Sequence, residues 1–218
     1  MPSPYGNSCR INRVPVDSCS HNLSKGPLMT VTIFGTGSMS QAIAGVLSRG
    51  GAEIQTIAHD DPRQDVAGDI VVLAVPYPAL AAIAAEYRAD LAGKTVVDIT
   101  NPLDFATFDA LVVPADSSAA AELQALLPDS RVLKAFNTTF AATLASGTVG
   151  GEPTTVLVAG DDAAAKEALV TAIAAGGVRA VDAGALSRAR ELEAIGFLQL
   201  TLAAGEKVGW DGGFALVG

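Results

Sequence analysis

Residues 31–49 contain a short apolar segment, two glycines and a longer amphipathic segment in immediate succession. Residues 30–34 are mostly β-branched or aromatic, which favours a buried strand. Gly35 and Gly37 end that strand: the first permits a tight turn, and the second lets the backbone approach a phosphate closely. The residues after Gly37 begin a helix whose first amides can bind an anion. This order predicts the phosphate-binding start of a dinucleotide-binding domain.

The third position of this glycine fingerprint is Ser40 instead of glycine. Serine is small enough for the helix to pack closely on the strand. A second apolar strand is expected at 54–58, where the ribose end of a dinucleotide would lie. The alternative is an ordinary strand, turn and helix without a ligand, which this combined context disfavours.

The composition is typical of an α/β domain with enclosed parallel strands. Half of the 218 residues are hydrophobic, but the apolar runs at 70–85 and 195–204 are interrupted and fall short of the ~20 residues needed to cross a membrane. The net charge of −9 argues against a nucleic-acid-binding surface. We therefore expect a cytoplasmic protein with neither membrane nor nucleic-acid partners.

Residues 1–28 differ from the rest of the chain. They are rich in Ser, Pro and Asn, lack the apolar core of a secretory signal, and contain both cysteines, Cys9 and Cys19. We expect a disordered extension, or a segment upstream of a protein that starts at Met29. The predicted domain is 29–218, without disulfides or cysteine metal sites.

Further strands are expected at 70–75, 95–99, 131–136, 154–159 and 178–182, and a long apolar helix at 186–208. These elements predict a Rossmann-type, doubly wound parallel sheet with a helical C-terminal appendage. Ligands bind outside the carboxyl ends of strands in such sheets. The residues that follow three strands, and so fall at this edge, are Pro76 and Tyr77, Asn101 and Pro102, and Asn137.

Few residues are suited to acid–base or metal chemistry. The chain has two histidines, His21 and His59, so the sequence predicts no metal site and disfavours a Ser-His-Asp relay. Carboxylates such as Asp98 and Asp104 are interpreted as caps and loop charges. A cofactor site without a certain catalytic residue suits hydride transfer, because the cofactor supplies the chemistry.

Five segments resemble the NADP oxidoreductases that depend on the deazaflavin coenzyme F420, especially their short bacterial members: GTGSMSQAIAGVLSRGG, AVPYPAL, VVDITNPL, LKAFNTTFAATL and DAGALSRARELEAIGFLQLTLA. The resemblance covers about 31–218. It implies direct hydride exchange between NADP(H) and a second ring system. We also expect a homodimer. The resemblance also implies cofactor-binding roles for Gly35, Thr36, Gly37, Ser38 and Met39 at the pyrophosphate, His59 at the 2′-phosphate, Pro76 and Tyr77 at the nicotinamide ribose, and Asn101 and Asn137 at the nicotinamide. Two further residues are expected to bind the cofactor: Pro102 beside Asn101, and Arg63, which would reach the 2′-phosphate if its loop folds back.

Two questions stay open at this stage. Ala58 and His59 replace the family's Ser-Arg pair and precede Asp60 and Asp61, and an acidic group here favours the free ribose hydroxyls of NAD. The electron acceptor is a deazaflavin or, alternatively, a flavin, quinone or imine. Its pocket is expected to contain Tyr77, Phe140, Trp210 and Phe214. A non-catalytic NADP(H) sensor is the remaining alternative.

Overall fold

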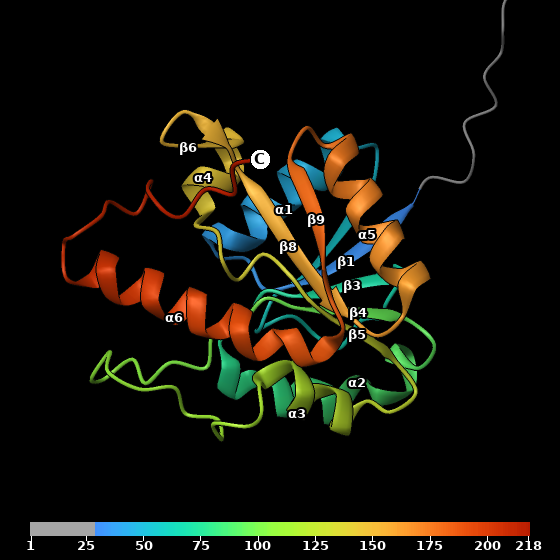
Figure 1. Ribbon diagram of the computed structural model, residues 1–218. Coiled ribbons are helices and arrows are strands. Elements are labelled where there is room, and N and C mark those ends of the chain that lie inside the picture. The colour runs from blue at the N-terminus through green and yellow to red at the C-terminus, as the bar shows by residue number, and fades with distance from the viewer. Residues whose placement is uncertain (1–28) are drawn as a thin grey trace, which may run out of the picture.

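A seven-stranded sheet in the order β2-β1-β3-β4-β5-β8-β9 forms the centre of the molecule (Figure 1). The structure is a computed structural model that describes residues 29–218, so the predictions for 1–28 lie outside the described residues. The strands are β1 (Thr30–Phe34), β2 (Glu53–Ile57), β3 (Ile70–Leu73), β4 (Thr95–Asp98), β5 (Arg131–Lys134), β8 (Thr155–Gly160) and β9 (Arg179–Gly184).

Helices cover both faces of this sheet. Apolar residues of α1 (Ser38–Arg49) and α5 (Ala163–Ala175) share one core cluster, and those of α2 (Leu80–Leu91) and α3 (Ala119–Leu126) share another. All residues of β3 and β4 are buried, as expected for strands enclosed on both faces. The α/β fold with a mostly parallel sheet is therefore confirmed.

The last two strands depart from the predicted all-parallel arrangement. β1 to β5 are parallel, whereas β8 pairs antiparallel with β5, and β9 runs parallel to β8. Between β5 and β8 the chain forms only the six-residue α4 (Ala141–Ser146) and the hairpin β6 (Thr148–Val149) and β7 (Glu152–Pro153). A parallel return is usually made by a full helix that crosses the sheet. The connection between β5 and β8 contains only a short helix and a hairpin, and it re-enters the sheet at the edge where β5 ends.

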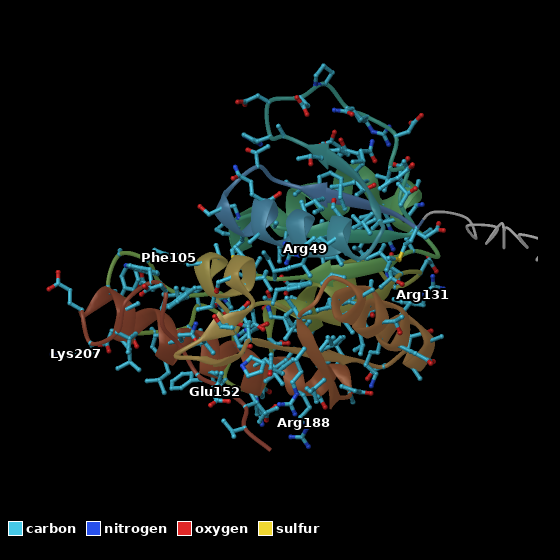
Figure 2. The ribbon with its side chains drawn as sticks, turned by 90° about the horizontal axis from the view of Figure 1, so that it is seen from above. Arg49, Phe105, Arg131, Glu152, Arg188 and Lys207 are labelled. Carbon is cyan, nitrogen blue, oxygen red and sulfur yellow. The ribbon has the colours of Figure 1, made fainter. Side chains whose placement is uncertain are left out.

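The expected helix at 186–208 is a short 3₁₀ turn, η2 (Leu186–Arg188), followed by α6 (Ala189–Ala204). α6, red in Figure 1, lies alongside α3 and extends beyond the sheet. The loop between β4 and α3 extends toward the same side; Phe105 in that loop and Lys207 after α6 mark the two segments in Figure 2. No helix within 29–218 is long and apolar enough to span a bilayer.

Candidate dinucleotide site

The first glycine of the turn is required by the fold itself. Gly35 has a φ of +107°, and a Cβ at this position would overlap the carbonyl oxygen of Ala74. Its N–H donates to Ile57 O at 2.9 Å, and its carbonyl accepts from Ser40 Oγ at 2.6 Å. Ser40, at the third fingerprint position, is buried, and its hydrogen bond connects the helix to the turn. At Gly35 the backbone that follows β3, at Ala74, therefore excludes a side chain.

The second glycine faces open space. A Cβ on Gly37 would meet no atom within 4 Å, and Gly37 is the N-cap of α1 without a capping side chain. The first helical hydrogen bond runs from Gln41 N–H to Gly37 O at 3.0 Å, which leaves the amides of Ser38 and Met39 directed out of the helix end. The first turn of α1 contains no acidic residue. Backbone amides and the helix dipole can therefore bind an anion here.

Two cavities meet at this turn. One of about 490 Å³ is lined by Ser38, Met39, Ile99, Asn101, Phe136, Asn137, Thr139, Phe140, Ala141, Ala142, Leu200 and Trp210. The other, of about 250 Å³, is lined by Phe34, Gly35, Ile57, Ala58, His59, Asp61, Val75, Pro76, Ala79, Ala82, Ile83, Glu86 and Tyr87. An extended dinucleotide with its pyrophosphate at the helix end would reach into both, so we call them the nicotinamide cavity and the adenosine cavity.

A pair of amide side chains lines the nicotinamide cavity. Asn101 Nδ2 donates to Asn137 O at 2.9 Å, and Asn137 Nδ2 donates to Asn101 Oδ1 at 2.9 Å and to Leu192 O at 2.8 Å. Both protons of Asn137 Nδ2 are thereby used, which fixes the orientation of its amide. Asn137 Oδ1 is buried and finds no donor among residues 29–218. An unpaired buried acceptor is costly, and a carboxamide N–H of a bound nicotinamide would satisfy it.

α6 supplies the wall behind this amide pair. A Cβ on Gly196 would overlap Asn101 Oδ1, so only glycine lets α6 approach so closely. Gly196 and Leu192 were not among the predicted site residues. A glycine inside an otherwise regular helix was the available signal, because glycine lowers helix stability and such a position needs a packing reason.

A buried ion cluster ties α6 to the sheet. Lys134 Nζ lies 2.8 Å from Asp98 Oδ2 and 2.8 Å from Glu193 Oε1, and it also donates to Thr100 O. All three charged side chains are fully buried. Glu193 Oε2 accepts from Ala119 N–H at 3.0 Å, so the same carboxylate caps α3. Asp98, interpreted from sequence as a cap, is thus part of an internal charge network adjoining the site.

Burial dominates the electrostatics of this cluster. It raises the pKa of Glu193 above its ordinary value, although the Lys134 ammonium opposes the shift. Two buried carboxylates share one ammonium, so removing Lys134 would leave both carboxylates without a compensating charge. The cluster therefore holds α6, and with it Gly196 and the Leu192 carbonyl, in one position.

The chain is strained next to this cluster. Phe136 is fully buried and has a φ of +63°, which is rare for a bulky residue. It lies between Lys134 and Asn137, and its carbonyl accepts from Thr139 Oγ1 at 2.8 Å. Backbone strain of this kind persists where the surrounding structure fixes it, and it clusters at functional sites. Here it turns the chain so that Asn137 lines the cavity.

The four aromatic residues predicted to form one acceptor pocket are not together. Phe140 and Trp210 line the nicotinamide cavity, with ring centroids 5.1 Å apart. Tyr77 instead donates its hydroxyl to Glu122 at 2.5 Å and lines a hollow between α2 and α3; burial, followed by this bond, raises its pKa to about 12. Phe214 lines a third hollow with Ile195 and Leu198 of α6. The C-terminal segment turns back after Trp210, so Phe214 packs beside α6 instead.

Other predicted residues are distributed around the cleft. His59 and Pro76 line the adenosine cavity. Thr36 is exposed in the glycine turn, and its carbonyl accepts from Gln41 Nε2 at 3.1 Å. Pro102 is buried, and its carbonyl accepts from Val112 N–H at 2.7 Å. Within 29–218, no three His, Cys, Asp or Glu side chains are grouped to hold a metal ion.

Arg63, predicted at the 2′-phosphate, is held outside the adenosine cavity. Its guanidinium forms an ion pair with Asp90 and lies 5.0 Å from the centroid of the Tyr87 ring. Tyr87 itself lines the cavity, whereas Arg63 contacts the Tyr87 ring and is not among the lining residues. The tethering partners lie in α2, far from Arg63 in sequence, which is why the sequence did not reveal them.

The fold is a Rossmann-like α/β fold of the kind found in NAD(P)-binding dehydrogenases. The fold resembles a glycerol-3-phosphate dehydrogenase from Coxiella burnetii, with a TM-score of 0.54 at 14% identity over 72% of this chain and 54% of that one. A family model described as NADP oxidoreductase, coenzyme F420-dependent, matches residues 61–102.

Two relatives are more similar. The chain is 33% identical over 154 residues to the F420-dependent NADP reductase of Methanocaldococcus jannaschii, covering 69% of each protein. A crystal structure from Arthrobacter sp. FB24, described as an F420-dependent NADP reductase, superposes on 87% of this chain and 100% of that one with a TM-score of 0.75 and 26% identity. This chain belongs to the coenzyme F420-dependent NADP oxidoreductase family.

Proposed function

We propose that this protein transfers hydride between NADP(H) and coenzyme F420 or a planar acceptor of similar shape. The observation that carries the proposal is the unpaired Asn137 Oδ1 in the nicotinamide cavity, next to the free amides of α1. The nicotinamide would supply the hydride chemistry when bound. Family membership and the name of the Methanocaldococcus relative support the deazaflavin as acceptor.

The residues of this chain act by binding and orientation. The first amides of α1 would hold the pyrophosphate beside Gly37, and Asn137 Oδ1 would accept from the nicotinamide carboxamide. Asn101 keeps the Asn137 amide in the required orientation. Phe140 and Trp210 offer an aromatic surface for a second ring. None of the side chains that line the nicotinamide cavity within 29–218 is acidic, basic or a thiol, which suits a step without proton transfer.

Stopped-flow kinetics with NADPH deuterated on either face of the nicotinamide would test this proposal. We expect label in reduced F420 from one stereoisomer only, because direct transfer uses one face and that carbon does not exchange its new hydrogen with water. A simple flavin serves as the second acceptor. Tight NADPH binding without turnover of either acceptor would contradict the proposal and favour the sensor alternative.

A further inference from the structure

The charges of the adenosine cavity do not suit a 2′-phosphate. Its acidic lining residues are Asp61 and Glu86, and the imidazole of His59 also lines it. No lysine or arginine within 29–218 is among its lining residues. A phosphate monoester carries nearly two negative charges at neutral pH. Two nearby carboxylates would repel it, whereas the neutral hydroxyl of an unphosphorylated ribose would meet no such opposition.

Asp61 also accepts a hydrogen bond from a backbone amide that could otherwise donate to a phosphate. Ala58 N–H, the first amide after β2, donates to Asp61 Oδ2 at 2.8 Å, and Gln64 Nε2 donates to the same oxygen at 3.1 Å. The exposed Asp61 carboxylate therefore places a negative charge next to the end of β2. Carboxylates in this region of dinucleotide folds bind the ribose 2′-hydroxyl of NAD, and arginines accommodate the 2′-phosphate of NADP.

The nearest arginine is engaged elsewhere. Arg63 follows Asp61 by two residues, but its charge is compensated by Asp90 and its guanidinium stacks on Tyr87. To contact a phosphate in the cavity it would have to leave both partners. The Tyr87 ring is itself buried and packs edge-on against Phe34, with centroids 4.9 Å apart, so it gives the guanidinium a fixed surface.

We infer that Asp61 determines nucleotide specificity in this chain, and that the protein binds NADH at least as tightly as NADPH. The inference rests on the proposed function, since it concerns the adenosine end of the same bound dinucleotide. It departs from the family's NADP assignment because the described residues that line the adenosine cavity include two carboxylates and no lysine or arginine.

Calorimetric titration of the full chain with NADH and with NADPH measures the preference. Asp61→Asn keeps an oxygen that can accept from Ala58 N–H but removes the charge, so we expect it to shift the affinity ratio toward NADPH by about tenfold. Asp61→Ala, which also releases the amide, should shift the ratio in the same direction. Adenosine 2′,5′-bisphosphate and AMP, titrated in parallel, isolate the effect at the ribose.

The control is Asp60→Asn, an exposed neighbour outside the cavity lining, which should leave the ratio unchanged. Wild-type protein that binds NADPH tenfold more tightly than NADH would overturn the inference, as would an Asp61→Asn ratio equal to that of the wild type. Either result leaves the proposed hydride transfer intact. Failure of both nucleotides to bind would instead overturn the proposed function together with the inference.

Discussion

The phosphate-binding turn and the nicotinamide cavity are built in opposite ways. The turn consists of consecutive residues, 35–40, whose bonds to one another and to β2 and β3 set its shape. The amide pair at the nicotinamide cavity joins Asn101 to Asn137, and α6 closes it from a third part of the chain. A single added atom can therefore disrupt the turn, whereas the shape of the nicotinamide cavity depends on the packing of elements that are distant in sequence.

The two glycines of the turn allow folding and binding to be separated. Gly35→Ala places a Cβ against the backbone of Ala74 at a φ of +107°, and should destabilise the protein by roughly 2–5 kcal/mol. Gly37→Ala places its Cβ in open space where a pyrophosphate would lie. We expect near-wild-type stability and at least about tenfold weaker NADPH binding. Urea unfolding and calorimetry measure the two quantities, and equal stability of both variants would contradict the assignment.

Two helical glycines provide the matching test for the nicotinamide cavity. Gly196→Ala drives Asn101 out of its pair with Asn137, and a displacement of about 1 Å at a reacting group can slow hydride transfer by ~100-fold. Gly45→Ala in α1 is the control, because its Cβ would meet only Arg49 at an ordinary 3.6 Å. The control should keep the wild-type rate and gain about 0.5–1 kcal/mol of stability. A wild-type rate in Gly196→Ala would show that Asn101 is not needed in this position.

The smallest effect concerns the cluster that holds α6. Since burial raises the pKa of Glu193, the folded state binds its proton more tightly than the unfolded state does. The free energy of unfolding should then fall as pH rises from the ordinary value of 4.5 to the raised one, and stay constant above it.

Glu193→Gln should remove this slope from a series of thermal unfolding curves. The exposed Glu167→Gln in α5 should leave the slope unchanged. The pKa values of Asp104 and Asp182 are lowered from 3.8, so these groups change the free energy of unfolding only below pH 3.8. This range does not overlap the range expected for Glu193. A slope that persists in Glu193→Gln would assign it to another group.

Much of the fold was predictable because it is encoded over short distances. Residues 30–49 formed the expected strand, turn and helix. The direction of β8 was not predicted, because it depends on the edge of the sheet at which the chain emerges from α4. The clustering of Lys134, Asp98 and Glu193 was equally hidden, because their side chains meet only after β4, β5 and α6 have packed.

The sequence by itself determined the anion-binding turn, because φ preferences, strand propensity and helix-end amides act between neighbouring residues. It also placed Asn101 and Asn137 at the ends of two strands. Only the tertiary structure decided that these amides pair, that Gly196 packs against them, and that Arg63 is tied to Asp90 instead of facing a ligand. Such contacts join residues distant in sequence, so packing geometry, not local propensity, selects among their possible partners.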